Sequence, residues 1–364
     1  MLGISVYPYK ENIEETLSYI KKAADLGYGR IFTNLLEVKE DKEALLATMK
    51  KVIGFARELG MEVVLDVNPA VFEQLHISYQ NLDFFADMNA TGIRLDTSFD
   101  GLVESFLTYE HNHLDIEVNI SNDTAYVENI LRYRPNAKKL IGCHNFYPQR
   151  FTGLGYDYFK KCSLKYKKLG LRTAAFINSH EASHGPHPHT DGLCSLEMHR
   201  DKPIVVQAKH LVALGCIDDI IIANAFASDA ELEAVSRVEQ DQIVLDVVFN
   251  NSVSPEEKNL VLQEQHINRG DISDYMIRST FVRLAYKNKS IPANGTQDKV
   301  QYGDITIGND SFGQYRGELN IVLQDMPDKG HYKNVVGRIV EEELFLLSYI
   351  KPWTKFRFRE FQSK

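Results

Sequence analysis

The sequence predicts an α/β fold in which a (β/α)8 TIM barrel is followed by a small antiparallel β-barrel domain. From residue 1 to about 237, eight short apolar runs alternate with longer charged segments that have helical spacing. After about residue 242 the pattern changes to short strands broken by Gly, Asn, Asp and Pro, which is typical of a small β-barrel. We therefore expect a barrel domain over residues 1–240 and a β-barrel domain over residues 241–364.

The eight predicted barrel strands are, in order, "LGISVY", "RIFTNL", "MEVVLDV", "GIRLD", "LDIEVNI", "KLIGC", "RTAAFI" and "DIIIA". The helical segments 12–27 and 41–60 both end in glycine, which suits a helix C-terminus. A doubly wound open sheet is the alternative, but it requires a glycine-rich turn after an early strand, and "SVYPYKEN" is not one. In the second domain the predicted strands are "QIVLDVVFN", "VQYGDITIGND", "GELNIVLQD", "NVVGRIVEE" and "KFRFREF", with one helix near "SPEEKNLVLQEQ".

Composition narrows the range of partners. The net charge of −9 argues against general attraction to nucleic acid or to an anionic membrane, so a bound anion needs a local cationic cluster. No apolar run approaches the length of a membrane span, and the first residues resemble a strand, not a signal peptide. The four cysteines are scattered, as in proteins with reduced thiols. We expect a cytoplasmic protein without nucleic-acid or membrane partners, and its oligomeric state stays open.

Polar side chains gather at the carboxyl ends of the predicted strands, where a TIM barrel carries its active site. Several also suit helix N-caps or loop anchors, but together they predict a pocket for a charged, hydroxyl-rich small molecule. The candidate substrate-binding residues are Tyr7, Asn34, Asn68, Arg94, Asn119, His144, Asn145, Tyr147 and Asn224. Tyr7, Tyr9, Phe146, Tyr147 and Phe151 offer rings that can stack on sugar faces.

Two carboxylates on adjacent predicted strands, Asp66 and Asp96, suit the acid and base pair of glycoside hydrolysis. Arg94 and Asp96 fall on the same face of their strand, so they can form an ion pair that favours the ionised form of Asp96 and suits it to a base or nucleophile. The general acid needs a raised pKa, and Glu37 and Glu197 are the further catalytic candidates.

The segment 178–203 after the seventh strand is too long for a simple connection. It contains His180, His184, His187 and His189, but the intervening Gly and Pro residues break any helix that would align them. We expect a mobile, solvated lid with no metal and no cofactor. At the end of the segment lie Glu197, His199 and Arg200, and loops at this place in a TIM barrel often bind phosphate.

The motifs "GISVYP", "RLDTSF", "HNFYPQRFTGL" and "GLCSLEMHR", with "MIRST" and "GDITIGNDSFGQYRGELNIVL" further on, resemble the bacterial 6-phospho-N-acetylmuramidase family over essentially the whole chain. The resemblance implies a TIM barrel followed by a cyclophilin-like β-barrel. It also implies cleavage of the N-acetylmuramic acid 6-phosphate–N-acetylglucosamine disaccharide during peptidoglycan recycling. One departure is Cys194 and Ser195, which stand where the family usually has proline and threonine.

On this resemblance, His144, Asn145 and Tyr147 are expected to line the sugar subsites. Arg150 is expected to reach the phosphate or the lactyl carboxylate. The phosphate pocket is expected to draw on Arg200 and His199, with Arg150 and, from the second domain, Arg278 in support. A non-catalytic phosphosugar-binding or regulatory protein is the main alternative. A pyridoxal-phosphate barrel is disfavoured because Lys10 lies beyond the end of the first predicted strand.

Overall fold

The computed structural model describes residues 1–8, 12–35, 42–68, 72–73, 75, 77–182, 184–186, 191–294 and 298–362. The chain divides into two compact units, Met1–Val238 and Glu239–Lys364. None of the described helices combines the length and the apolar character that a membrane span requires.

The first unit is a closed barrel of eight parallel strands, in which each strand pairs with the next and β8 pairs with β1. This confirms the predicted TIM barrel. The strands are β1 (Leu2–Ser5), β2 (Arg30–Asn34), β3 (Glu62–Val67), β4 (Gly92–Leu95), β5 (Asp115–Asn119), β6 (Leu140–Cys143), β7 (Arg172–Ile177) and β8 (Asp219–Ile222). Because all eight run in the same direction, their carboxyl ends meet at one end of the barrel, and the segments that follow them form its rim.

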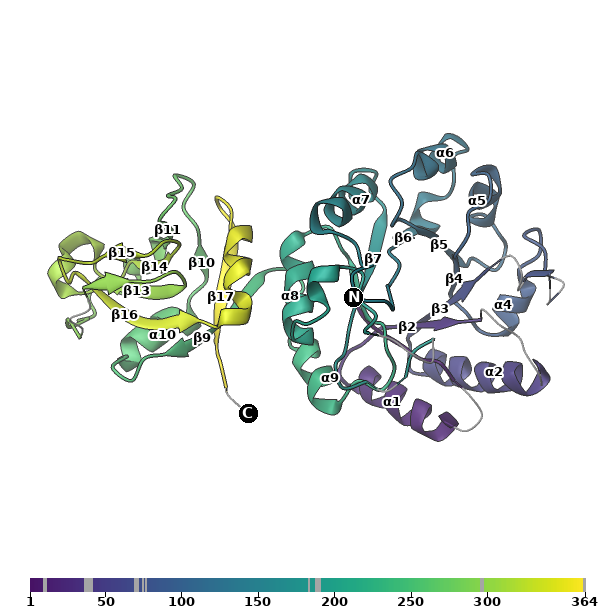
Figure 1. Ribbon diagram of the computed structural model, residues 1–364, viewed down its shortest axis with the longest axis horizontal. Coiled ribbons are helices and arrows are strands. Elements are labelled where there is room, and N and C mark those ends of the chain that lie inside the picture. The colour runs from purple at the N-terminus through teal and green to yellow at the C-terminus, as the bar shows by residue number, and fades with distance from the viewer. Residues whose placement is uncertain are drawn as a thin grey trace. The chain divides into compact units, whose positions relative to one another are not determined.

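Helices surround the ring of strands (Figure 1). They are α1 (Ile13–Asp25), α2 (Lys42–Glu58), α4 (Asp83–Asp87), α5 (Leu102–Leu107), α6 (Tyr126–Arg132), α7 (Tyr156–Lys168), α8 (Ile204–Leu214) and α9 (Asp229–Ser236), with short 3-10 turns at Ala137–Lys139 and Glu197–His199. Gly27 and Gly60 follow α1 and α2 with positive φ, as the sequence predicts for helix ends.

A buried ion network fills the amino-terminal half of the barrel, and the sequence analysis did not predict it. Arg30 has no exposed side-chain surface and pairs with Glu117 and with Asp219, the latter at 2.5 Å. Arg172 links Asp219, at 2.8 Å, to Glu62, at 2.9 Å. These charges come from five different strands, so the network holds the base of the barrel together. Buried charges are tolerated only when they are paired in this way.

The second unit contains a sheet of seven strands in the order β10-β17-β9-β16-β13-β14-β11. Its pairs are antiparallel except for β17 with β9, so the sheet is mixed where the sequence suggested a wholly antiparallel one. A hydrogen bond from Arg269 N to Arg278 O, 3.1 Å long, links the two edges and nearly closes the sheet.

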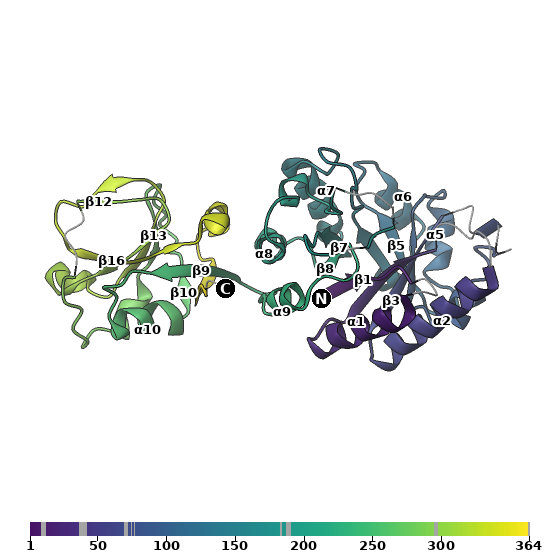
Figure 2. The same cartoon turned by 60° about the horizontal axis from the view of Figure 1, so that its bottom comes forward.

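The strands of the second unit are β9 (Ile243–Phe249), β10 (His266–Ile267), β11 (Met276–Ser279), β12 (Lys299–Val300), β13 (Asp304–Gly308), β14 (Leu319–Val322), β15 (Met326–Pro327), β16 (Lys333–Ile339) and β17 (Lys355–Glu360). Helix α10 (Pro255–Gln263) lies beside the sheet (Figure 2). The 3-10 turns of this unit are Phe281–Leu284, Asp310–Tyr315 and Glu341–Tyr349.

Candidate active site

Two aspartates share one guanidinium at the carboxyl ends of β3 and β4. Arg94 Nη1 lies 2.6 Å from Asp66 Oδ1 and 3.5 Å from Asp96 Oδ1. The Asp66 and Arg94 side chains are nearly inaccessible, whereas the Asp96 side chain is 46% exposed. Asp66 lies directly opposite Arg94 in the sheet register, which turns both side chains to the same side. The pair therefore combines one buried and one accessible carboxylate.

Burial raises the pKa of Asp66 to about 6, although the charge and hydrogen bond of Arg94 oppose the rise. The nearby carboxylates of Asp96 and Glu117 add to the rise. A carboxyl group with a pKa near neutrality can hold a proton and release it during a reaction. Asp66 thus has the property that the sequence analysis sought in Glu37 or Glu197.

Amides from neighbouring strands flank this pair. Asn34 lies opposite Asp66 in the register, is half-buried, and its side chain has no partner within the described ranges. Asn68 directly follows β3 and is also half-buried. Asn119 accepts a hydrogen bond from Ser121 N at 2.8 Å. Among the described residues, Asn34 therefore keeps its full hydrogen-bonding capacity for a ligand, whereas Asn119 has engaged its side-chain oxygen.

His144 is fully buried. Its Nε2 lies 2.8 Å from Ser163 Oγ, which itself donates to Phe159 O, so Nε2 carries the proton. Its Nδ1 lies 3.2 Å from Ser121 Oγ, which also accepts from Asn145 N. Burial lowers the pKa of His144 to about 3, so the ring is neutral. The expectation that His144 lines a sugar subsite does not fit a side chain with 0% exposure.

This hydrogen-bonded chain reaches the acidic pair through Asn145. Arg94 Nη2 donates to Asn145 Oδ1, while Nη1 holds the two aspartates. Ser195 Oγ donates to Asn145 O at 2.8 Å, so the serine in the family's threonine position uses its hydroxyl. His144, Ser121 and Ser195 thus position Asn145, and Asn145 positions Arg94. Ser121 and Ser163 were missed because single serines carry no sequence signal of this kind.

Three phenylalanine rings, from β2, from β7 and from the segment after β6, form an aromatic cluster. The rings of Phe32, Phe146 and Phe176 meet edge to face with centroids 5.0–6.1 Å apart. Tyr7 is buried, and its hydroxyl donates to Ala223 O at 2.6 Å, so its ring is not available for stacking. Tyr147 is half-buried, and burial raises the pKa of its hydroxyl. Of the predicted stacking rings, Phe146, Tyr147 and the exposed Phe151 remain accessible.

Glu197 and Arg200 form a two-point ion pair that also engages the loop after β6. Glu197 accepts from Arg200 Nε and Nη2, both at 2.7 Å, and from the backbone amides of Phe151 and Gly153. These bonds, that of Arg200 first, lower the pKa of Glu197 to about 2. A Cβ on Gly153 would lie 2.5 Å from Glu197 Oε2, so the two loops meet too closely for a side chain there. A permanently ionised, fully engaged carboxylate is unsuited to general-acid catalysis.

Arg200 itself is 2% exposed, and its Nη1 donates to three backbone oxygens, those of Tyr147, Asp191 and Gly192. His199 is fully buried, with Nε2 2.7 Å from His210 Nδ1. Its burial keeps the pKa of His199 well below the usual range. Neither side chain presents a free cationic group, which speaks against the expected phosphate contacts. The side-chain amide of Asn224 is also engaged within the protein, because it makes two hydrogen bonds with the backbone of Ser179.

Arg150 keeps an accessible guanidinium. Its side chain is 39% exposed and forms a two-point pair with Asp201, which is 74% exposed. Arg278 lies in the second unit, where it pairs with Asp271 at 3.1 Å. Glu37, Tyr9, His187 and His189 lie outside the described residues. His180 and His184 are held by Arg200 O and by a bridge to Ala225, so this part of the loop is anchored.

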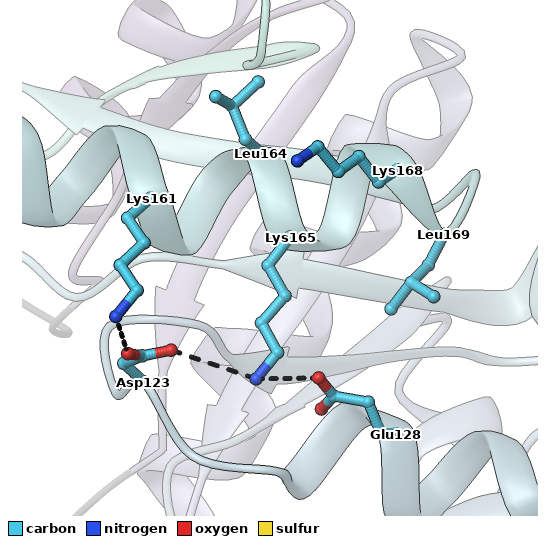
Figure 3. A pocket seen from close by; sticks show the side chains of 7 residues that line it. All are labelled: Asp123, Glu128, Lys161, Leu164, Lys165, Lys168 and Leu169. Atoms are coloured by element: carbon cyan, nitrogen blue, oxygen red, sulfur yellow. Dashed lines mark hydrogen bonds and ion pairs between the residues drawn. The ribbon is translucent and has the colours of Figure 1, made fainter.

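Two further polar clusters lie on the surface of the barrel unit. A hollow of about 470 Å³ on the barrel flank is lined by Lys161, Lys165, Asp123 and Glu128, whose charges pair with one another (Figure 3). Within the described residues, the atoms of Asp83, Glu110 and His111 lie close enough to hold a metal ion. His111 already bonds both carboxylates at the surface, and we assign it no metal.

The first unit is thus a TIM-barrel protein that holds two carboxylates around one guanidinium at the carboxyl ends of its strands. Residues 2–237 match the N-terminal model of 6-phospho-N-acetylmuramidase, and residues 243–359 match the C-terminal model. The chain belongs to the 6-phospho-N-acetylmuramidase family, whose name is that of a glycoside hydrolase. The family assignment made from the sequence motifs is confirmed.

Two crystal structures are similar over the full length. One, of an uncharacterized B. cereus protein, has 50% identity, 99% coverage of both chains and a TM-score of 0.90. The other, of a conserved Enterococcus faecalis protein of unknown function, has 26% identity, covers 99% of this chain and 96% of that one, and has a TM-score of 0.71. No match is found among proteins with curated descriptions.

Proposed function

We propose that this protein is an intracellular glycosidase of peptidoglycan recycling. Its substrate is the disaccharide of N-acetylmuramic acid 6-phosphate and N-acetylglucosamine, which it hydrolyses in the cytoplasm. The observation that carries the proposal is the pairing of buried Asp66, with its raised pKa, and accessible Asp96 on one arginine. Membership of the family supports the choice of sugar.

In the proposed reaction Asp66 is the general acid. It donates its proton to the glycosidic oxygen as the bond between that oxygen and the anomeric carbon breaks. Asp96 either attacks the anomeric carbon or removes a proton from the attacking water. One water is consumed, and the phosphorylated muramic acid and N-acetylglucosamine are released. Arg94 holds both carboxylates in place.

The pH dependence of kcat/KM follows from the pKa of Asp66. A general acid must be protonated to act, so activity is present below its pKa and is lost as the pH rises through it. We therefore expect an alkaline limb with an apparent pKa of about 6. Initial rates of N-acetylglucosamine release between about pH 4 and 8, a window of about two pH units on either side, measure it. A profile that stays flat across this window would remove Asp66 as the acid.

We further propose that Arg150 contacts the phosphate. An exposed ion pair such as Arg150–Asp201 contributes little stability, so a phosphate can replace Asp201. Arg150→Ala should lower kcat/KM for the phosphorylated disaccharide about ten- to hundredfold, since a hydrogen bond to a charged group contributes about 1.5–3 kcal/mol. Activity on the unphosphorylated disaccharide should stay unchanged.

Arg237→Ala is the matched control for this experiment, because Arg237, directly after α9, is also exposed and ion-paired. It should leave both activities unaltered. Equal losses on both disaccharides in Arg150→Ala would assign Arg150 to catalysis or structure and not to phosphate recognition.

The direct test of the function is incubation of the purified protein with the phosphorylated and unphosphorylated disaccharides. We expect N-acetylglucosamine to appear rapidly from the former and slowly from the latter. Proton NMR of the first-formed anomer shows whether Asp96 acts as nucleophile, with retention, or as base, with inversion. Tight binding of the phosphorylated disaccharide without any cleavage would favour the binding protein instead.

A further inference from the structure

The second unit carries a polar sheet face that the barrel chemistry does not use. In the register of β11, β14 and β13, Arg278 lies opposite Asn320, and Asn320 lies opposite Thr306. Thr306 in turn lies opposite Val335 on β16, two residues after Lys333. Residues opposite one another, and residues two apart on a strand, share a face. Arg278, Asn320, Thr306 and Lys333 therefore project from the same side of the sheet.

Lys333 is poorly satisfied on this face. Its Nζ lies 3.3 Å from Met276 Sδ, a weak acceptor, and 5.9 Å from the centroid of the Phe312 ring. Within the described ranges it forms no ion pair, although its side chain is half-buried. Its burial lowers the pKa of the amine, although the charges of Asp328 and Glu318 oppose the fall, and the charge of Arg278 adds to it. A half-buried ammonium group normally has an oxygen acceptor.

Thr306 is a second unsatisfied group on the same face. The residue is 0% exposed, and its Oγ1 has no hydrogen-bond partner in the described part of the chain. A buried hydroxyl without a partner is costly, so such positions are usually completed by water or by a ligand. The Thr306 hydroxyl and the Lys333 amine can both donate a hydrogen bond. Neither has an oxygen acceptor among the described residues.

The charges around this face leave a positive excess. Arg269 and Arg278 share the single carboxylate of Asp271. Arg283 pairs with Glu318 at 3.2 Å, and the charges of Glu318 and Asp328 also act on Lys333. Four cations, Arg269, Arg278, Arg283 and Lys333, thus face the three carboxylates of Asp271, Glu318 and Asp328. A local cationic excess in a chain of net charge −9 is the condition for holding an anion against the overall field.

We propose that this face is a binding site for a small phosphate-bearing anion, with Lys333 and Arg278 as its cationic donors. Two cationic groups suit the charge of a phosphate monoester better than that of a single carboxylate. The stacked rings of Phe312 and Tyr332, 5.5 Å apart, lie beside the amine and offer an apolar flank for the rest of the molecule. The site lies within the second unit and does not depend on the proposed reaction of the barrel.

Chemical labelling of lysines in the full-length protein tests the site. Acetic anhydride modifies neutral amines, so the lowered pKa makes Lys333 reactive, and peptide mass spectrometry gives its rate separately from other lysines. Inorganic phosphate should slow labelling of Lys333 about fivefold at about four times its Kd, as mass action requires. Lys355, an exposed lysine of β17 in the same sheet, is the internal control and should not be protected. Sodium chloride at the same ionic strength should protect neither lysine.

Variants then separate the site from a general salt effect. Arg278→Gln should abolish the protection of Lys333, whereas Lys355→Met should leave it intact. Calorimetric titration of phosphate should give binding heat in the parent protein and none in Lys333→Met. If Lys333→Met does not fold, protection in the parent protein and its loss in Arg278→Gln still decide the question. Equal protection of Lys333 by acetate, or equal protection of Lys355 by phosphate, would overturn the proposal.

Discussion

Asp66→Asn should retain the fold and reduce turnover of the phosphorylated disaccharide at least about a hundredfold, the usual contribution of general-acid catalysis. Asparagine preserves the shape of the side chain and can still accept the hydrogen bond from Arg94, but it has no acidic proton to donate. The measurement is steady-state release of N-acetylglucosamine, together with the thermal transition as a check on folding. The alkaline limb near pH 6 should vanish from the residual activity.

The leaving group distinguishes the roles of the two aspartates. A nitrophenyl glycoside of the phosphorylated muramic acid needs little protonation, so Asp66→Asn should cleave it at close to the parental rate. Asp96→Asn should be impaired on both substrates, because attack at the anomeric carbon is needed in each case. Asp87→Asn, at an exposed aspartate of α4, is the matched control and should behave as the parent protein. Near-normal rates in both Asp66→Asn and Asp96→Asn would place the chemistry elsewhere.

Arg30→Met should lower the melting temperature of the barrel by at least about 6 °C. The change leaves Glu117 without its closest cation and weakens the hold on Asp219, and breaking a buried pair costs about 3–5 kcal/mol. For a domain of this size each kcal/mol corresponds to about 2–4 °C. Differential scanning calorimetry of the full chain, following the barrel transition, provides the measurement.

Two further variants give this prediction its controls. Arg172→Met removes a cation that is 29% exposed, so its effect should be much smaller. The double variant Arg30→Met with Glu117→Leu should recover part of the loss, because it no longer leaves a buried carboxylate without a partner. A single variant Arg30→Met as stable as the parent protein would show that the network contributes nothing to the barrel.

The barrel was predictable because its signals are local. The eight apolar runs and the helical spacing between them repeat regularly, and the glycines at 27 and 60 mark helix ends directly in the sequence. In the second unit the long strands β9 and β16 were equally visible. The two-residue strand β10 was not, because so short a segment has no alternation of its own. The parallel pairing of β17 with β9 depends on the tertiary fold, because the sequence of neither strand determines its partner or direction.

The sequence predicted which residues of the candidate site lie at the ends of strands. It did not predict which side chains they contact. Alternation placed Arg94 and Asp96 on one face, and both do contact through Nη1. That Arg94 also binds Asp66 depends on the register between two strands, which the sequence does not specify. The partners of Arg200 and His144 come from loops and helices distant in the chain, so their burial could not be inferred from the motifs that contain them.

The hydrogen bonds that join Glu197 to the loop after β6 also affect the free energy of ligand binding. Backbone bonds from Tyr147 to Cys194 and from Leu154 to Ser195 join the loops after β6 and β7 before any ligand arrives. In the described parts of these loops, binding therefore does not have to order a free segment, which commonly costs about 0.5–1.5 kcal/mol for each flexible side chain immobilised. This rim is preorganised, so the affinity that it gives a ligand reflects the contacts made, with little offset from lost conformational entropy.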